Sequence, residues 1–329
     1  MTEATGPSTW GAGTAGPVPP ATGSRLTVTK GHGTRNDFVL LWDPDGGLDL
    51  TPALVQTLAD RRAGVGGDGV IRLVRSAAAP DAARALAEDP AAEWFMDYRN
   101  ADGSVAEMCG NGVRVVAAFA ERTGAWDGTG DLVLATRAGV RRVHTVAPAA
   151  DDGQDTAPDA RVPWYEVDMG PWTLPGGSSA AASGGDVEVL VAGLDVPRPA
   201  LRVDVGNPHT VVAVPDPPVL AAADLTRAPR VEPAPPAGTN VEVVVPLGEG
   251  PDGSARLRMR VHERGVGETE SCGTGACAAA VAVRTWAGPG APDLWWVQVP
   301  GGTLRVRVDA HRVHLAGPAV LTFTADVPV

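Results

Sequence analysis

The chain has 329 residues, of which 44% are hydrophobic, and its 27 basic and 39 acidic side chains give a formal net charge of −12. A chain of this length usually divides into two domains, and it has enough apolar residues for two hydrophobic cores. The acidic balance, with no cluster of basic residues, excludes nucleic acid as an expected partner. No apolar run approaches the roughly 20 residues of a membrane span, and no secretory signal is recognisable, so we expect a cytoplasmic protein.

The cysteines and the lysine are few. Three cysteines, none in a Cys-x-x-Cys pair, indicate neither a disulfide framework nor a cysteine zinc site, and reduced thiols fit the cytoplasm. Pyridoxal phosphate, the usual cofactor for chemistry at an amino-acid α-carbon, is carried on a lysine. The one candidate, Lys30, lies in a Val- and Thr-rich stretch that predicts an edge or opening strand, which is a poor setting for a Schiff base.

Along the chain, residues 1–24 are mostly Gly, Pro, Thr, Ser and Ala, so we predict a disordered extension there and a fold that starts near Arg25. Short runs of β-branched residues then predict strands, which outnumber the helices. The clearest runs are 38–41, 69–74, 140–146, 165–169, 203–205, 241–245, 257–261 and 304–308. Three stretches rich in Ala, Gly and Pro predict surface loops, at 147–160, 175–186 and 228–238.

The first helical pattern begins with Thr51 as its N-cap and Pro52 in its first turn. It places Leu54 and Leu58 on one face, and Gly64 predicts its end.

Two further helices each begin directly after a cysteine, at Cys109-Gly-Asn-Gly and at Cys272-Gly-Thr-Gly. The first has one apolar face and ends at Gly124, and the second is apolar all round, as a helix buried within a sheet layer would be. The two motifs are separated by about half of the chain, which indicates an internal duplication. The predicted fold class is therefore α+β, with two pseudo-symmetric domains. Each is a mostly antiparallel or mixed sheet wrapped round a central helix, and the active site lies in the cleft between them.

We expect the N-terminal domain to span 25–150 and to be completed by the C-terminal strand at about 317–329. The C-terminal domain then spans 151–316.

A cysteine at a helix N-terminus faces the positive end of the helix dipole and backbone N–H groups that have no intrahelical partner. Such thiols have pKa values of roughly 3.5–7.5 instead of about 8.5, so we expect the thiolate to be stabilised at both motifs. The adjoining glycines let a substrate approach the backbone closely. The N–H groups of four residues would then bind a carboxylate and its developing negative charge: Gly110, Asn111, Gly273 and Thr274.

Two such motifs that face one another predict a two-base site. One thiolate would remove the proton from an α-carbon while the opposite thiol returns a proton to the other face, which inverts the centre. A single Cys-Gly could be only a tight turn with a small buried side chain, but two copies with matched glycines favour the functional interpretation. Cys277 falls inside the apolar helix, and we assign it to packing.

Six segments resemble, in order, the successive motifs of the diaminopimelate epimerase family. They are Asn36-Asp-Phe, Asn100-Ala-Asp-Gly-Ser, Glu107-Met-Cys-Gly-Asn-Gly-Val-Arg, Gly206-Asn-Pro-His, Thr239-Asn-Val-Glu and Glu263-Arg-Gly-Val-Gly-Glu-Thr-Glu-Ser-Cys-Gly-Thr-Gly.

The resemblance implies that Cys109 and Cys272 are the paired acid and base, with His209 supporting the first thiol and Glu263 the second. Five residues would hold the substrate, chiefly at its distal end, and the last would pair the distal carboxylate bidentately: Asn36, Asn100, Asn207, Asn240 and Arg264. The implied reaction is the conversion of LL-diaminopimelate to the meso form, in lysine and peptidoglycan precursor biosynthesis.

The resemblance also implies no metal and no organic cofactor, in agreement with the absence of a dinucleotide-binding or P-loop motif. The expected partner is the small-molecule substrate, with neither nucleic acid nor a membrane, and a homodimer stays open.

Other interpretations remain. Taken singly, Asn207 could belong to a turn, His209 could be a hydrogen-bonded strand-end histidine, and Glu263 could belong to a solvated ion pair. Proline racemases and hydroxyproline epimerases resemble this fold and also use two cysteines, but Asn111, where that family typically has His, and Arg264 favour the diaminopimelate branch. A thiol hydrolase would need one cysteine with His209.

Overall fold

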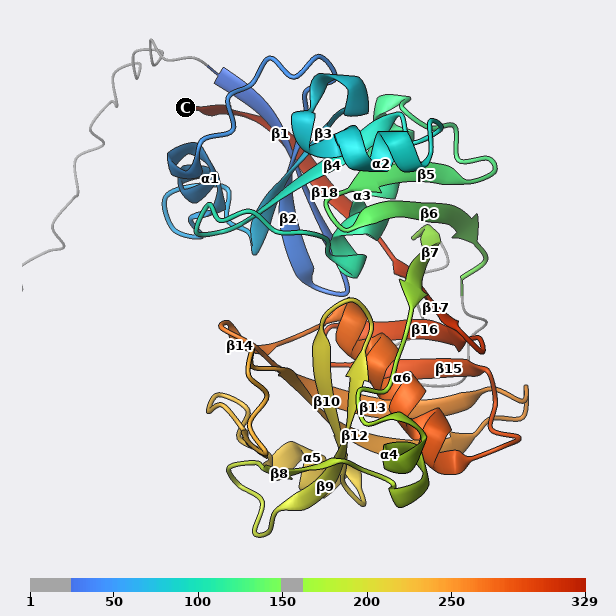
Figure 1. Ribbon diagram of the computed structural model, residues 1–329. Helices are drawn as coiled ribbons and strands as arrows, with labels where there is room; N and C mark the ends of the chain where they lie inside the picture. Colours follow the sequence, from blue (N-terminus) through green and yellow to red (C-terminus); the bar gives the residue numbers. More distant parts are fainter. Residues whose placement is uncertain (1–24, 149–161) are drawn as a thin grey trace, which may run out of the picture.

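The computed structural model describes residues 25–148 and 162–329, and Figure 1 shows them in two lobes, each with strands around one long helix. The extension predicted at 1–24 and nearly all of the loop predicted at 147–160 lie outside the described residues. No helix in the described part of the chain is long and apolar enough to cross a membrane.

The first lobe contains the elements from the beginning of the described chain to the sixth strand. They are β1 (Arg25–Gly33), β2 (Asn36–Trp42), α1 (Pro52–Ala59), β3 (Gly69–Arg75), η1 (Ser76–Ala78), η2 (Pro80–Ala82), α2 (Ala83–Glu88), β4 (Trp94–Asn100), α3 (Gly110–Thr123), β5 (Leu132–Thr136) and β6 (Gly139–Val146).

The remaining elements begin with a strand that runs between the lobes and end with one that returns to the first lobe. They are β7 (Trp164–Pro171), α4 (Gly177–Ser183), β8 (Val187–Leu190), β9 (Arg198–Asp204), β10 (Pro208–Ala213), α5 (Pro217–Ala222), β11 (Arg230–Glu232), β12 (Asn240–Glu249), β13 (Ala255–Glu263), β14 (Gly267–Thr269), α6 (Gly273–Ala287), β15 (Leu294–Val299), β16 (Gly302–Val308), β17 (Arg312–Pro318) and β18 (Val320–Pro328).

The strand pairings repeat from one half of the chain to the other. In the first half, each strand from β1 to β7 pairs with the next one. The six pairings are, in order, antiparallel, parallel, antiparallel, parallel, antiparallel and antiparallel. The second half has the same order of antiparallel and parallel pairings, along the strands β9, β10, β12, β13, β15, β16 and β17. The last strands of the two series, β7 and β17, pair with one another. The predicted α+β fold with two pseudo-symmetric halves is confirmed.

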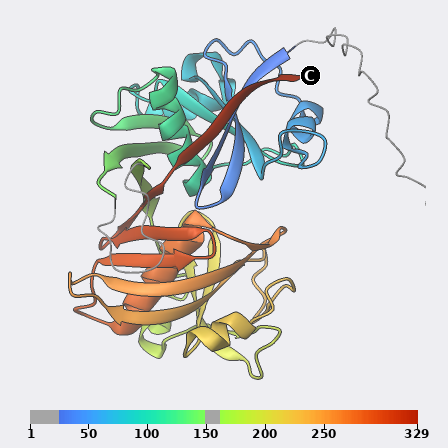
Figure 2. The same ribbon diagram turned by 180° about the vertical axis from the view of Figure 1, so that it is seen from behind.

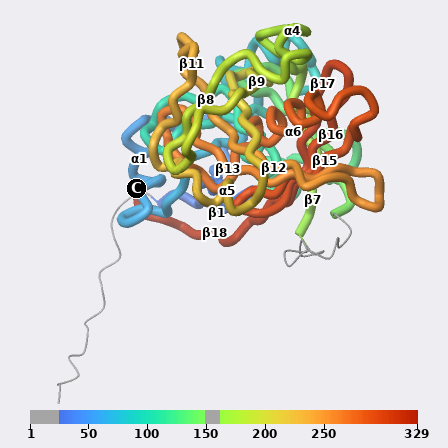
Figure 3. The backbone as a smooth tube through the Cα atoms, turned by 90° about the horizontal axis from the view of Figure 1, so that it is seen from below, coloured from blue at the N-terminus to red at the C-terminus, as the bar shows by residue number. Residues whose placement is uncertain are grey.

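The C-terminal strand closes the first lobe. β18 runs antiparallel to β1, from Leu26 opposite Val327 to His32 opposite Val320. Figures 2 and 3 show it passing from the second lobe to lie beside β1. Because β1 is paired on its other side with β2, it opens the sheet but is not an edge strand.

Three local predictions were wrong. α1 ends at Ala59, not near Gly64, because the Asp60 carboxylate accepts the N–H groups of Arg62 and Ala63 and turns the chain out of the helix. The loop predicted at 175–186 contains α4, whose Ala and Ser residues tolerate a helix that Gly184 ends at a φ of 78°. The loop predicted at 228–238 contains β11, which pairs with β8 and buries Val231.

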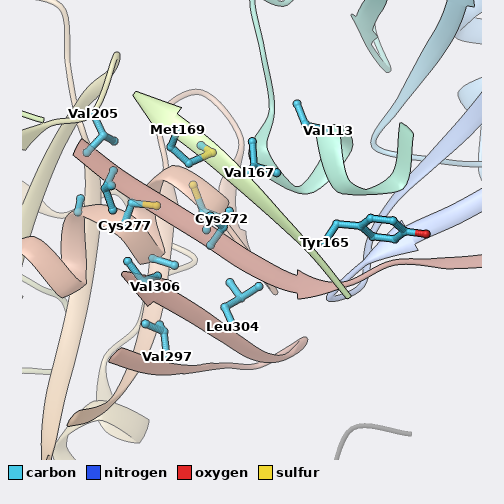
Figure 4. Close-up of a cluster of buried hydrophobic side chains, with 14 of the residues drawn as sticks. Val113, Tyr165, Val167, Met169, Val205, Cys272, Cys277, Val297, Leu304 and Val306 are labelled. Carbon is cyan, nitrogen blue, oxygen red and sulfur yellow. The ribbon is translucent and has the colours of Figure 1, made fainter. Parts of the chain in front are cut away.

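The two central helices are buried as predicted. α3 ends at Gly124, whose φ of 76° is the left-handed conformation of a helix C-cap. Every side chain of α6 from Gly275 to Val283 is buried. Figure 4 shows part of the core that they share with β7 and β16, including Cys272 and Cys277. The packing role predicted for Cys277 is confirmed, because its side chain is fully buried in this core.

Leu315 of β17 holds the two helices at their common end. Its Cδ2 would lie 3.0 Å from a Cβ on Gly110 and 2.9 Å from a Cβ on Gly273. Leu315 therefore fills the space between the first residues of α3 and α6.

We predict that Leu315→Ala lowers the free energy of unfolding by about 2–5 kcal/mol, since it leaves a cavity between the two helices. Leu190→Ala is the control, because this side chain is 40% exposed and its truncation should cost within about 0.5 kcal/mol. Urea unfolding followed by circular dichroism measures both, and equal losses would contradict the role of Leu315.

Candidate active site

Each sequence-predicted cysteine caps its helix in the same way. Cys109 has an extended backbone at the start of α3, and its Sγ accepts the N–H of Gly112 at 3.4 Å. Cys272 does the same at the start of α6, where its Sγ accepts the N–H of Gly275 at 3.4 Å. Both sulfur atoms therefore lie at the positive end of a helix.

The two helix N-termini meet across the halves of the molecule. A Cβ on Gly273 would lie 3.1 Å from the Oδ1 and 3.3 Å from the backbone nitrogen of Asn111. The Asn111 amide donates to the carbonyl and to the hydroxyl oxygen of Ser271, each at 3.2 Å. Since Ser271 precedes Cys272, this contact brings the two cysteine motifs together.

A strained hairpin supports this contact. Thr34 and Arg35 connect β1 to β2 with φ angles of 50° and 64°, a conformation that threonine rarely adopts. The buried Thr34 hydroxyl is hydrogen-bonded to the Ser271 hydroxyl at 2.6 Å. This bond across the lobes holds the strained turn beside the cysteines.

The lowered thiol pKa values expected from the helix N-termini are wrong for this structure. Burial raises the pKa of Cys109 to about 11, against the opposing effect of the Gly112 N–H, and the negative charge of Glu263 raises it further. Burial also raises the pKa of Cys272 well above its usual value, again helped by the charge of Glu263. Loss of water around the sulfurs outweighs their N–H contacts and favours the neutral thiol at both positions.

A partly buried acidic group, Glu263, accompanies Cys272. Burial raises the pKa of Glu263, whereas its hydrogen bond with Thr269 lowers it, as does another with Cys272. Glu263 thus contacts the thiol with which the family resemblance pairs it, and its charge also acts on Cys109.

The hydrogen bonds of the His209 ring go to residues other than the first thiol, which the resemblance implies that it supports. Its Nδ1 is bonded to Glu242 at 2.7 Å and its Nε2 to the Asn207 side-chain oxygen at 3.0 Å, so both ring nitrogens are occupied. His209 lies on β10, in the half of the molecule that carries Cys272. It holds the Asn207 amide in place, and that amide donates to the Thr274 hydroxyl at 3.4 Å.

The other predicted asparagines differ in their positions. Asn36 is next to the first cysteine, because its Oδ1 accepts from the Cys109 thiol at 3.5 Å and from the Asn111 amide at 3.3 Å. Asn100 instead closes its own turn, with its amide donating to the Ser104 hydroxyl at 2.9 Å.

Asn240 and Arg264 lie together on the side of Cys272. The Asn240 oxygen accepts the backbone N–H of Arg264 at 2.9 Å, and the Arg264 guanidinium donates to the Ala237 carbonyl at 2.5 Å. Asn240 therefore fixes the backbone from which Arg264 extends.

A cleft of about 600 Å³ lies between the lobes, lined by β1 and β2 on one side and by residues 266–271 on the other. Asn36 lines it, and the Asn36 amide donates to Asp68 at 2.6 Å. Asp68 is paired in turn with Arg61, and Lys30 with Asp37. The single lysine is thus held in an ion pair, and a charged network orients the asparagine that contacts Cys109.

Sequence reasoning missed Ser271, Asp68, Glu242 and Arg114. Ser271, Glu242 and Arg114 lie within the quoted motifs, yet only their hydrogen bonds in the folded structure give them a role. An alignment of the two halves of the chain would have singled out Glu242 and Arg114, because their equivalents in the other half are apolar or neutral.

No group of three or more His, Cys, Asp or Glu side chains that could hold a metal ion occurs in 25–148 or 162–329.

Solved structures share this fold. A phenazine biosynthesis protein of the PhzF family from Bacillus anthracis superimposes with a TM-score of 0.62 at 15% identity, covering 93% of this chain and 100% of that one. A hydroxyproline epimerase from Agrobacterium vitis gives a TM-score of 0.54 at 16% identity, covering 92% and 91%. This chain therefore shares its fold with both proteins.

Sequence comparison identifies the family. The diaminopimelate epimerase family model matches residues 28–156 and 201–322. The diaminopimelate epimerase of Streptomyces coelicolor is 48% identical over 91% of this chain and 94% of its own length. That of Thermobifida fusca is 44% identical over 92% and 98%. The chain belongs to the diaminopimelate epimerase family, and the proline-specific alternative is related to it in fold only.

We predict that alkylation of Cys109 in the free protein accelerates about tenfold per pH unit between pH 7 and 10, since the thiolate fraction rises by that factor below the raised pKa. Mass spectrometry of iodoacetamide-treated protein that lacks the other two cysteines measures the rate, with glutathione as the exposed-thiol control. A rate that levels off near pH 7 would show that the helix N-terminus dominates instead.

Proposed function

We propose that this protein interconverts LL- and meso-diaminopimelate by a two-base proton transfer in which Cys109 and Cys272 are the paired acid and base. The observation that carries the proposal is the meeting of two equivalent cysteine-capped helices, with Gly273 against Asn111. A substrate carbon placed there has a sulfur on each side.

The reacting carboxylate would bind to the N–H groups of the first helical residues. Those of Gly110, Asn111, Gly273 and Thr274 lie in the first turns, where backbone donors have no intrahelical acceptor. As a proton leaves the α-carbon, negative charge grows on this carboxylate, and fixed donors stabilise it without rearrangement.

The proton balance needs no external acid or base. The C–H bond breaks toward one sulfur, which becomes a thiol, while the opposite thiol donates its proton to the other face and becomes a thiolate. The number of bound protons is unchanged, and the enzyme is left in the form that catalyses the reverse reaction.

Substrate binding would supply the initial thiolate. Because burial keeps both thiols neutral in the free site, a positive charge beside a sulfur is needed to lower its pKa. The α-ammonium group of an amino acid supplies one. Glu263, in hydrogen-bond contact with Cys272, can take part in moving that proton.

The distal end of the substrate carries a second ammonium and a second carboxylate. We assign it to Asn36, Asn100, Asn207, Asn240 and Arg264, of which Asn36 is next to Cys109 and Asn207 is held by His209. The guanidinium of Arg264 would pair with the distal carboxylate. The homodimer and the cytoplasmic location stay predictions.

We predict that Cys109→Ala and Cys272→Ala each lower the rate of epimerisation by roughly 10²–10⁴-fold, since each removes one acid–base group. LL-diaminopimelate in deuterated water should give meso product with one deuterium at the inverted carbon, detected by mass spectrometry. Cys277→Ala is the matched control and should retain turnover, because Cys277 is a packed core residue.

Two results would contradict the mechanism. Unlabelled product would exclude proton exchange with the thiols, and full turnover without Cys272 would point to a one-cysteine reaction.

A further inference from the structure

The two halves of the site share one backbone frame, so equivalent positions can be compared. In β2 and β3, Phe38 pairs with Gly69 and Leu40 with Ile71. In β10 and β12, His209 pairs with Asn240 and Val211 with Glu242. His209 therefore corresponds to Phe38, and Glu242 to Ile71.

The glycines of the helices confirm this correspondence. A Cβ on Gly275 would meet Glu242 at 2.7 Å and Cys272 at 3.2 Å. In the other half, a Cβ on Gly112 would meet Ile71 at 3.1 Å and Cys109 at 3.5 Å. A buried carboxylate thus packs beneath one cysteine where an isoleucine packs beneath the other.

The acidic groups that act on the two cysteines lie in the half that carries Cys272. Glu263 lies nine residues before Cys272, and the residue nine before Cys109 is the neutral Asn100. Glu242 has no solvent exposure, and its Oε2 has no hydrogen-bond partner in the described residues. The half that carries Cys272 therefore contains the buried Glu242, the partly buried Glu263 and His209. Neutral side chains take their places in the other half.

The buried cation, Arg114, lies on the helix that begins after Cys109. Arg114 lies five residues after Cys109, and its equivalent five residues after Cys272 is Cys277. The Arg114 side chain is fully buried, and the acceptors of its guanidinium in the described residues are neutral oxygens of Asn111, Thr34 and Pro318. Burial lowers the pKa of its guanidinium to about 10, which leaves it cationic at neutral pH.

The structure makes a closely fitting space for this cation. Its Nη2 donates to the Asn111 side-chain oxygen at 2.6 Å, and its Nη1 to the Pro318 carbonyl at 3.4 Å. A Cβ on Gly317 would lie 1.8 Å from Nη1, and one on Gly33 would lie 3.1 Å from Nη2. Only glycine at 317 leaves room for the guanidinium.

A fully buried cation that has only neutral acceptors is costly, and a negative charge nearby would offset the cost. A thiolate at Cys109 or at Cys277 would interact favourably with the charge of Arg114. At Cys109 itself, the charge of Glu263 opposes ionisation and that of Arg114 favours it. At Cys272, the charges of Glu263 and Glu242 both oppose it.

We propose that Arg114 is a positioning residue whose buried guanidinium directs the negative charge of the cysteine pair to Cys109, while Glu242 and Glu263 keep Cys272 protonated. This inference rests on the proposed two-base function. The near-symmetric frame thus carries opposite buried charges, and Cys109 is the base when the empty site meets its first substrate.

The test measures thiolate formation and not turnover. Two parent proteins each keep one active-site cysteine: Cys272→Ala with Cys277→Ala keeps Cys109, and Cys109→Ala with Cys277→Ala keeps Cys272. Arg114→Met and Arg114→Lys are placed in both, and the rate of reaction with iodoacetamide is measured at pH 8.

Arg114→Met should slow the alkylation of Cys109 about tenfold, which corresponds to one unit of its pKa. Alkylation of Cys272 should change less than about twofold, and Arg114→Lys should restore most of the Cys109 rate because it keeps the charge. A purely steric role predicts the opposite sign, because truncating a long side chain opens a path to the sulfur.

The proposal is overturned if Arg114→Met leaves the Cys109 rate unchanged or raises it, or if Cys272 slows by the same factor. If circular dichroism shows that the Arg114→Met protein does not fold, the alkylation rates of the Gly317→Ala variant test the proposal instead. Its added methyl group displaces the guanidinium, so Cys109 alone should slow, and an unchanged rate overturns the proposal. Deuterium incorporation by the wild-type enzyme tests the two-base function separately, so failure of one is distinguishable from failure of the other.

Discussion

The close contact between the N-termini of α3 and α6 is the constraint on which the rest of the site depends. Gly273 lies so near Asn111 that a side chain at 273 would meet its backbone nitrogen at 3.3 Å. The Asn111 amide and the Thr34 hydroxyl then join the first half to Ser271. These contacts fix two capping cysteines relative to one another, although they come from distant parts of the chain.

The repeated strand order explains how such a contact forms. Each half ends its series of pairings in a strand, β7 or β17, and these two strands pair with one another. Leu315 of β17 packs against the first residue of both helices. Duplication therefore produces two similar helix N-termini, and the shared strands bring them to one place.

Burial determines the chemistry at that place. In water a helix N-terminus would favour a thiolate, but the desolvated sulfurs here are held as neutral thiols. Charge enters the site only where a specific side chain supplies it. Arg114 favours ionisation of Cys109, which Glu263 opposes, whereas Glu263 and Glu242 both oppose ionisation of Cys272. Two chemically identical cysteines thus acquire different properties from their second layer of neighbours.

Much of this architecture could be predicted from the sequence, because its signals are local. The Cys-Gly-x-Gly repeats predicted both buried helices, and Gly124 predicted the end of the first. The end of α1 was missed because the Asp60 side chain competes for backbone N–H groups before Gly64 is reached. The raised thiol pKa values, and the bonds of His209 to Glu242 and Asn207, depend on burial and strand register, which a motif does not encode.

The proposed mechanism requires two sulfurs that are separated by the space of one substrate carbon. Treatment with 1,3-dibromoacetone, a short reagent that joins two thiols, followed by peptide mapping tests this arrangement most directly. We predict a single cross-link between the peptides of Cys109 and Cys272, with Cys277 unmodified. Separate single adducts at Cys109 and Cys272, or a cross-link to Cys277, would contradict it.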